Sequence, residues 1–308
     1  MCARKNAESP PAEVARDFAA LRAAGDVPGA SRSLGSAIAS WRDGVARWLV
    51  RLGVTPNHIT VAGCLFTVAA GYCLSRGASQ QVPYFQWVAG IVGWWPLVAA
   101  LLLLLAGACD MLDGAVARVG RRASRAGALL DSSLDRLGDM FIYIGCFLHF
   151  ARLETPNLTY QLLAVVALCN AVLISYIKAR AENLIEDCSV GYWLRGERFA
   201  AVLIGCVFGH VPAVLWQMAI GCGLTAWRRL SYGMQSLKAA DAGRSPPQRG
   251  PLPGWRGRFQ LWRRPRGSRA YDLVTGLNIA YIIIAPVFLP ALQAQGPWAD
   301  PLRRCLGG

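Results

Sequence analysis

Four aspartates in two pairs carry the most distinctive chemistry in the chain. Asp110 and Asp113 stand three residues apart and Asp131 and Asp135 stand four apart, so on helices each pair would project from one face. If the two helices run antiparallel, the four carboxylates converge. Converging carboxylates repel one another unless divalent cations lie among them, and hard oxygen ligands suit Mg²⁺ or Mn²⁺. The pattern predicts a site for two divalent cations, the arrangement that stabilises attacking and leaving oxygens in phosphoryl transfer.

An apolar run, LVAALLLLLAGAC, directly precedes the first of these aspartates. A carboxylate buried in hydrocarbon is unstable unless it is paired, protonated or bound to a cation. The 308 residues are 54% hydrophobic and only 16% charged, with a mean hydropathy of +0.33. This composition excludes an ordinary soluble domain and predicts an all-α integral membrane protein, in which ionisable groups at the membrane boundary are candidates for function.

Six apolar stretches approach the roughly 20 residues that a helix needs to cross the hydrocarbon core. They predict six transmembrane helices, at about 59–76, 86–108, 138–153, 160–177, 199–209 and 211–227. We interpret 198–231 as a tight hairpin of two helices broken near Pro212, and one long tilted helix is the alternative. A further apolar segment, 273–292, contains Pro286 and Pro290 and is either a kinked seventh span or a re-entrant segment.

Basic residues concentrate on one side of these spans. The segments 1–57, 109–137, 178–198 and 228–272 hold 8, 5, 4 and 11 of them, whereas the opposite loops hold little beyond Arg76 and Arg152. Because cytoplasmic loops carry the excess of positive charge, both ends of the six-helix unit and the acidic stretch are expected at the cytoplasmic face of the inner membrane. The net charge of +14 then reflects orientation and attraction to anionic membrane lipids, and no nucleic acid partner is expected.

Composition divides the chain into four parts. Residues 37–52 place Trp41, Trp48 and Leu52 on one helical face, which is typical of an amphipathic helix lying in the membrane interface; packing on another cytosolic element is the alternative. No cleavable signal peptide is expected at the start of the chain. The expected parts are a cytosolic tail (1–36), a membrane domain (37–231), a basic Pro/Arg-rich linker (232–272), and an apolar segment with a C-terminal tail (273–308).

The aspartates belong to a longer pattern, Asp-x-x-Asp-Gly-x-x-Ala-Arg, eight residues, Gly-x-x-x-Asp-x-x-x-Asp. Its fixed positions are Asp110, Asp113, Gly114, Ala117, Arg118, Gly127, Asp131 and Asp135. This pattern resembles the signature of the CDP-alcohol phosphotransferases, integral membrane enzymes of phospholipid synthesis. The segment Thr55-Pro56-Asn57-His58-Ile59-Thr60 is similar to the opening of the first helix in that family, and the six-helix count agrees with the family fold.

The resemblance implies a role for each signature residue. Asp110, Asp113 and Asp131 would hold two divalent cations, and Asp135 would contribute to the metal site and act as the general base. A pocket for the CDP moiety would be shaped by Gly114, Ala117, Arg118 and Gly127. Asp139, one turn further on, is not part of the signature and is expected to support the site from outside or to be a surface charge. Arg121, Arg122 and Arg125 are expected to be solvated or to contact lipid headgroups, and contact with the phosphates of CDP-diacylglycerol is the alternative.

A second basic cluster bears on the acceptor substrate. The segments 175–182 and 195–198 are similar to the branch that makes phosphatidylinositol phosphate, which implies an acceptor-phosphate site of Lys178, Arg180, Arg195 and Arg198. Orienting charges under the positive-inside rule are the alternative for this cluster. Leu194 and Gly196 depart from the branch, which usually has an acidic residue and often a proline there. Inositol phosphate is therefore the first choice of acceptor, with glycerol 3-phosphate and a neutral alcohol as alternatives.

The implied reaction moves a phosphatidyl group from CDP-diacylglycerol to the hydroxyl of a phosphorylated polyol and releases CMP. The resemblance also suggests a homodimer. A rival interpretation is a non-enzymatic transporter whose acidic residues bind a transported cation. A scaffold that has lost its chemistry is a third, which the complete set of signature carboxylates disfavours. The ten cysteines and the histidines His58, His149 and His210 show no metal-ligand or disulfide spacing.

Overall fold

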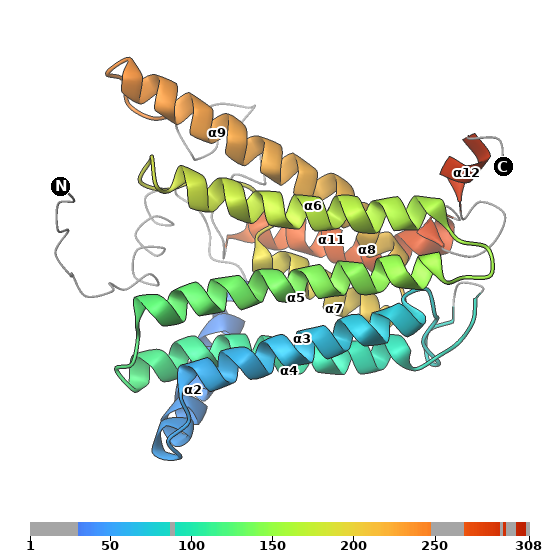
Figure 1. Cartoon of the computed structure of the whole chain (residues 1–308), viewed down its shortest axis with the longest axis horizontal. Helices are drawn as coiled ribbons and strands as arrows, with labels where there is room; N and C mark the ends of the chain where they lie inside the picture. The colour runs from blue at the N-terminus through green and yellow to red at the C-terminus, as the bar shows by residue number, and fades with distance from the viewer. Residues whose placement is uncertain (1–29, 87–89, 248–267, 290–291, 294–299, 306–308) are drawn as a thin grey trace.

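The computed structural model describes residues 30–86, 90–247, 268–289, 292–293 and 300–305, and these residues are almost entirely helical (Figure 1). Isolated bridges pair Gln81 with Val92 and Val82 with Phe85. The helices are α2 (Ala30–Arg51), α3 (Pro56–Gly77), α4 (Trp95–Val119), α5 (Arg125–Ala151), α6 (Leu158–Ala181), α7 (Arg195–Phe208), α8 (Val211–Gln217), the π-helical segment η1 (Met218–Cys222), α9 (Gly223–Asp241), α11 (Arg269–Phe288) and α12 (Pro301–Cys305).

Four of the described helices are long and apolar enough to cross a membrane: α3, α4, α6 and α11. The chain is therefore an all-helical integral membrane protein, as its composition predicts, while the count of six spans stays a prediction. Most of the predicted third span lies in α5, which also carries Asp131, Asp135, Arg136 and Asp139.

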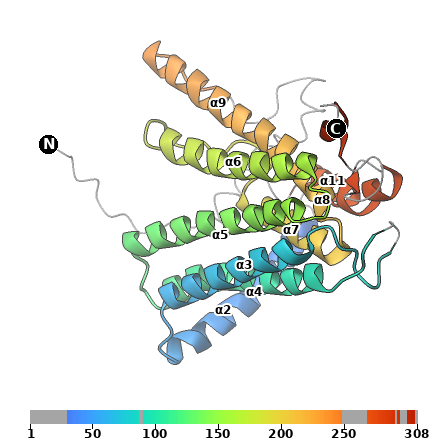
Figure 2. The same ribbon diagram turned by 45° about the vertical axis from the view of Figure 1, so that its right-hand side comes forward.

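The helices α3, α4, α5 and α6 lie lengthwise beside one another, and α9 diverges from α6 at one end (Figures 1 and 2). Glycines bring α3 and α5 into backbone contact, because a Cβ atom at Gly71 would collide with the Phe141 carbonyl and one at Gly145 with the Gly71 carbonyl. The main core takes buried side chains from α3, α4, α5, α6, α7, α8, η1, α9 and α11. Within it, Phe150 of α5 stacks on Tyr160 of α6 with ring centroids 4.8 Å apart. This packing fixes the helices that carry the aspartates.

The second span begins later than the apolar pattern predicts. α4 starts at Trp95, with Pro96 in its first turn, and the expected start at residue 86 is wrong. The described residues before it form a loop, closed by hydrogen bonds from Gln81 N to Ile91 O (2.8 Å) and from Gly93 N to Gln81 O (2.9 Å). Pro96 is favoured in a first helical turn, where its missing N–H is not needed, so the helix begins there.

The predicted hairpin is present. α7 ends at Phe208 and is capped by Gly209, whose φ of 70° suits glycine, and a new helix begins at Val211 with Pro212 in its first turn. Val214 packs so close to Gly205 that a Cβ atom there would collide with it, so the two arms fold on each other. The second arm continues through η1 and α9 to Asp241, ten residues into the segment expected as a linker, and residues 248–267 of that linker lie outside the described residues.

The predicted amphipathic helix is part of α2, which starts before residue 37, at Ala30. One face packs on α4, where buried Ala46 contacts Ala115 and Val116. Trp41 and Trp48 are 59% and 58% exposed on another face. One side of the helix thus packs on α4, a candidate membrane span, and insertion of the exposed tryptophans into the membrane interface stays a prediction. The rest of the predicted tail, residues 1–29, lies outside the described residues.

The C-terminal apolar segment forms one continuous helix, α11, which packs on α7 and α8. Pro286 lies in its last turn, and Pro290 falls outside the described residues. Of the two predictions for this segment, the helix agrees with a span and not with a re-entrant turn. The basic linker therefore leads into a helix of the membrane bundle.

Candidate active site

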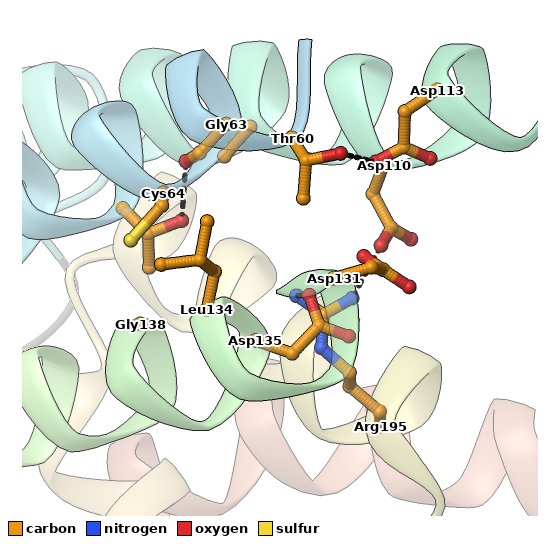
Figure 3. Close-up of a pocket in the computed structure, with 12 residues that line it drawn as sticks. Thr60, Gly63, Cys64, Asp110, Asp113, Asp131, Leu134, Asp135, Gly138 and Arg195 are labelled. Carbon is orange, nitrogen blue, oxygen red and sulfur yellow. Dashed lines mark hydrogen bonds and ion pairs between the residues drawn. The ribbon is translucent and has the colours of Figure 1, made fainter. Parts of the chain in front are cut away.

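A cavity between α3, α4, α5 and α7 brings the four aspartates together (Figure 3). α4 contributes Asp110 and Asp113, and α5 contributes Asp131 and Asp135. The side chain of Arg195, at the start of α7, reaches into the cavity beside Asp135. The remaining wall residues are Thr60, Gly63, Cys64, Thr67, Ala106, Leu134 and Gly138. The predicted convergence of the two carboxylate pairs is confirmed.

Three of the carboxylates have the spacing of a metal site. Asp110, Asp131 and Asp135 each offer a carboxylate oxygen, and these oxygens all lie within 4.8 Å of one another. Oδ1 of Asp131 is buried and accepts no hydrogen bond from the described part of the chain. A buried carboxylate oxygen without a donor is stabilised by a cation, so this set fits Mg²⁺ or Mn²⁺.

The fourth carboxylate, Asp113, is held in place by its neighbours. It is 8% exposed, and its Oδ2 accepts a hydrogen bond of 2.8 Å from the Thr60 hydroxyl of α3. Its Oδ1 accepts from the backbone N–H of Gly114. These two donors fix the orientation of the carboxylate toward the cavity that the other aspartates share.

Arg195 links the two aspartate pairs. Its Nη1 lies 2.7 Å from Oδ1 of Asp110 and its Nη2 lies 2.7 Å from Oδ1 of Asp135, so one guanidinium bridges α4 and α5. The planar fork of arginine suits such a double contact. Positive charge is thus favoured among these carboxylates.

Burial also shapes the acidity of the two aspartates on α5, which lie before the apolar part of that helix. Loss of water raises the pKa of Asp135 to about 7, although the nearby Arg195 acts in the opposite direction. Burial raises the pKa of Asp131 as well, and the Asp110 carboxylate raises it further. Both shifts show that negative charge at this place needs a counter-charge.

Arg198 lies one turn beyond Arg195 and is engaged elsewhere. Its Nη2 lies 2.7 Å from Oδ2 of Asp139, and the two side chains are only 3% and 14% exposed. The pair joins α7 to α5 next to the acidic cavity. Asp139 is therefore a buried partner of Arg198 and not a surface charge.

The other predicted site residues lie outside the wall of the acidic cavity. Lys178 pairs with Glu182 at 3.7 Å on the last turn of α6, and Arg180 is exposed. Arg118 is exposed at the end of α4, where its Nη1 lies over Gly114. Gly127 donates its N–H to Ser124 Oγ at 3.0 Å, which caps α5. The residues that the cavity wall does not include are Gly114, Ala117, Arg118, Gly127, Lys178, Arg180 and Arg198.

Sequence reasoning missed the contribution of α3. Thr60, Gly63, Cys64 and Thr67 line the cavity from that helix, and Thr60 binds Asp113 directly. Their positions, i, i+3, i+4 and i+7, put them on one face of the helix. A stripe of small and polar residues in an otherwise apolar span was the available signal.

Comparison with known proteins agrees with the motif. The sequence model of the CDP-alcohol phosphatidyltransferase family matches residues 53–227. The chain is 32% identical over 195 residues to an archaetidylinositol phosphate synthase of Methanothermobacter thermautotrophicus, covering 61% of this chain and 87% of that protein. It is 34% identical over 196 residues to the phosphatidylinositol phosphate synthase of Mycolicibacterium smegmatis, covering 60% and 80%.

Solved structures show the same likeness. The crystal structure of the Mycobacterium tuberculosis phosphatidylinositol phosphate synthase in complex with manganese and citrate aligns with a TM-score of 0.53 at 26% identity, covering 63% of this chain and 88% of that one. The structure of the same enzyme with CDP-DAG bound aligns with a TM-score of 0.53 at 26% identity, covering 62% and 92%.

Proposed function

The chain belongs to the CDP-alcohol phosphatidyltransferase family, and we propose that it transfers a phosphatidyl group from CDP-diacylglycerol to a hydroxyl of inositol phosphate, releasing CMP. The observation that carries the proposal is the cavity in which three aspartate carboxylates lie within 4.8 Å of one another beside Arg195. The names of the relatives support inositol phosphate as the acceptor, and the solved complex with CDP-DAG supports the donor.

Asp110, Asp113 and Asp131 are the proposed ligands of two divalent cations, and Asp135 contributes to the same site. The unsatisfied Oδ1 of Asp131 and the fixed orientation of Asp113 support this assignment. Bound Mg²⁺ or Mn²⁺ would stabilise the negative charge that develops on the phosphate oxygens of the departing CMP.

Asp135 is the proposed general base. The acceptor hydroxyl oxygen attacks the phosphorus that carries the diacylglycerol, the bond from that phosphorus to the CMP oxygen breaks, and the hydroxyl proton passes to the Asp135 carboxylate. The Asp135 carboxylate lies in the cavity wall beside Arg195, which places it where it can accept that proton.

The substrate contacts are proposed from the motif and the charges. Gly114, Ala117, Arg118 and Gly127 receive the CDP moiety, with Arg118 on its phosphates. Lys178, Arg180 and Arg195 receive the acceptor phosphate, and Arg195 is the member of this group that lies in the cavity. Arg198 is the fourth proposed member of this group. It lies on the same helix as Arg195, and its ion pair with Asp139 holds that helix in place.

We also propose that the chain has six spans, that its active site lies at the cytoplasmic face of the inner membrane, and that α2 lies in the membrane interface. The proposed oligomer is a homodimer. The distribution of basic residues supports the orientation, since the acidic cavity lies at the ends of α4 and α5 that adjoin the loop with Arg121 and Arg122.

An acceptor panel tests the function. Purified protein with Mg²⁺ or Mn²⁺ and labelled CDP-diacylglycerol receives inositol phosphate, glycerol 3-phosphate or free inositol, and CMP release is measured. We expect release with inositol phosphate. Release only with glycerol 3-phosphate would reassign the acceptor, and absence of release with all three would refute transfer. Metal-dependent binding of CDP separates the enzyme from a cation transporter, which has no reason to bind a nucleotide.

A further inference from the structure

The C-terminal helix α11 packs against the helix that brings Arg195 to the acidic cavity. The family match ends at residue 227, and α11 covers Arg269–Phe288, so it lies outside the shared domain. It nevertheless contacts both α7 and α8. Its position raises the question of what a helix outside the family domain does for the site.

The two faces of α7 serve different neighbours. With about 100° between successive residues, Arg195, Arg198 and Phe199 fall on one face. This face meets α4 and α5 through the ion pairs of both arginines and the packing of Phe199 on Gly107. The opposite face adjoins α11, with which it lines a second cavity through Glu197, Ala200, Ala201 and Ile204. α7 therefore lies between the acidic cavity and α11, and its rotation determines where Arg195 points.

The first turn of α7 depends on tertiary contacts for its order. Its N-cap residue is Leu194, which makes no side-chain hydrogen bond to the first turn. A helix end without such a cap frays more readily. Glu197 lies in this turn, and its Oε1 accepts a hydrogen bond of 2.7 Å from the Tyr271 hydroxyl of α11. This contact fixes the turn from the side opposite to the acidic cavity.

Tyr271 is itself well placed to hold that turn. Ser268 caps α11 by accepting from Tyr271 N at 3.2 Å, and the Ser268 side chain is buried. The hydroxyl of Tyr192, just before α7, donates to Thr275 Oγ1 at 3.1 Å. The ring centroids of Tyr192 and Tyr271 lie 5.8 Å apart. α11 thus binds both α7 and the chain that leads into it.

Two further hydrogen bonds fix the register of α11 along the second arm. Gln217 Nε2 donates to Asn278 Oδ1 at 2.7 Å, and His210 Nδ1 lies 2.8 Å from the Ile282 carbonyl oxygen. Polar contacts between membrane helices set a specific register, because their alternative in hydrocarbon is an unsatisfied group. These contacts hold α11 on the second arm, whereas the hydrogen bond of Tyr271 is the one that reaches the first turn of α7.

We propose that Tyr271 is a positioning residue for the reaction: through its hydrogen bond to Glu197, α11 holds the first turn of α7 in the rotation that directs Arg195 into the acidic cavity, and so sets the affinity for the acceptor phosphate. This inference rests on the proposed function, in which Arg195 contacts that phosphate. The C-terminal helix is then part of the active-site architecture.

Tyr271→Phe tests the proposal, because it removes only the hydroxyl. We expect the KM for inositol phosphate, and its Kd measured calorimetrically on the purified protein, to rise about fivefold to tenfold, the effect of one hydrogen bond. The KM for CDP-diacylglycerol should stay unchanged. Glu197→Gln keeps an oxygen that can accept from Tyr271, so its acceptor KM should rise less than that of Glu197→Ala, which removes the accepting oxygen.

Asn278→Ala is the matched control, since it removes a hydrogen bond from the same helix to α8 and not to α7. It should lower the melting temperature and leave the acceptor KM within about twofold, less than one hydrogen bond would contribute. An acceptor KM in Tyr271→Phe equal to that of the wild type, or an equal rise in both variants, would overturn the proposal. If the wild type releases no CMP with any acceptor, the proposed function fails instead.

Discussion

The buried pair of Arg198 and Asp139 gives a sharp prediction about how α7 is held. Replacing Arg198 with Met leaves a carboxylate that is 14% exposed without its partner, and replacing Asp139 with Leu leaves a guanidinium that is 3% exposed. Breaking a buried ion pair from one side costs about 3–5 kcal/mol, because the remaining charge is uncompensated. Each single variant should therefore be strongly destabilised.

The double variant should recover most of this loss. An apolar pair of similar volume removes both charges, and such replacements of buried ion pairs are often close to neutral. At about 2–4 °C per kcal/mol for a domain of this size, each single variant should melt roughly 10 °C below the wild type. The double variant should lie within a few degrees of it.

Thermal unfolding in detergent measures the cycle. Cys146, Cys206 and Cys222 are buried and free, so a thiol-reactive dye reports unfolding as an increase above the signal of the exposed Cys169 and Cys305. Arg180→Met, at an exposed arginine, is the control and should not change the melting temperature. Single variants as stable as the wild type, or a double variant no better than the worse single, would refute the role of the pair. A stable double variant with an acceptor KM far above that of the wild type would instead indicate that Arg198 contacts the phosphate.

Four further predictions concern the site and the packing behind it. Asp135→Asn should fold and bind CDP but lose turnover by about 10²–10⁴-fold, measured as CMP release; a near wild-type rate would contradict its role as base. Thr60→Val removes the donor to Asp113 and should weaken Mn²⁺ binding about 10–100-fold by electron paramagnetic resonance, whereas Thr60→Ser should not; equal affinities would contradict this orienting role. EDTA should abolish CMP release and Mn²⁺ should restore it; activity that persists in EDTA would argue against metal dependence. Gly145→Leu, which collides with the Gly71 carbonyl, should lower the melting temperature and Gly276→Ala, in open space, should not; equal values would contradict the close contact of α3 and α5.

Helix boundaries show the limit of what sequence patterns predict. The run from residue 86 is apolar enough to resemble the start of a span, yet α4 begins at Trp95. Hydropathy averages over a window and does not register that Gln81 pairs with Ile91 and Gly93 to close a loop. Local signals did better at the hairpin, because a glycine with positive φ followed by a proline in the first turn is a strong break wherever it occurs.

The two arginines of α7 show the same limit at the site. Arg195 and Arg198 are one turn apart, and the sequence offers both as equal candidates for binding phosphate. In the structure Arg195 bridges Asp110 and Asp135, whereas Arg198 is buried against Asp139. Residues three apart on a helix differ in direction by about 300°, so Arg195 and Arg198 lie on almost the same face. They still meet different aspartates of α5, because they lie at different heights along α7.

The sequence by itself determined the class of protein and the placement of each aspartate pair on one face of a helix. Hydropathy and helical spacing are local properties, and carboxylates three or four residues apart share a face of a helix in any fold. Only the tertiary structure decided that Thr60 orients Asp113, that Arg198 is an internal partner of Asp139, and that α11 adjoins the helix of Arg195. The residues that these contacts join are 53, 59 and 74 positions apart in the sequence. They arise from how the helices pack, which no local pattern specifies.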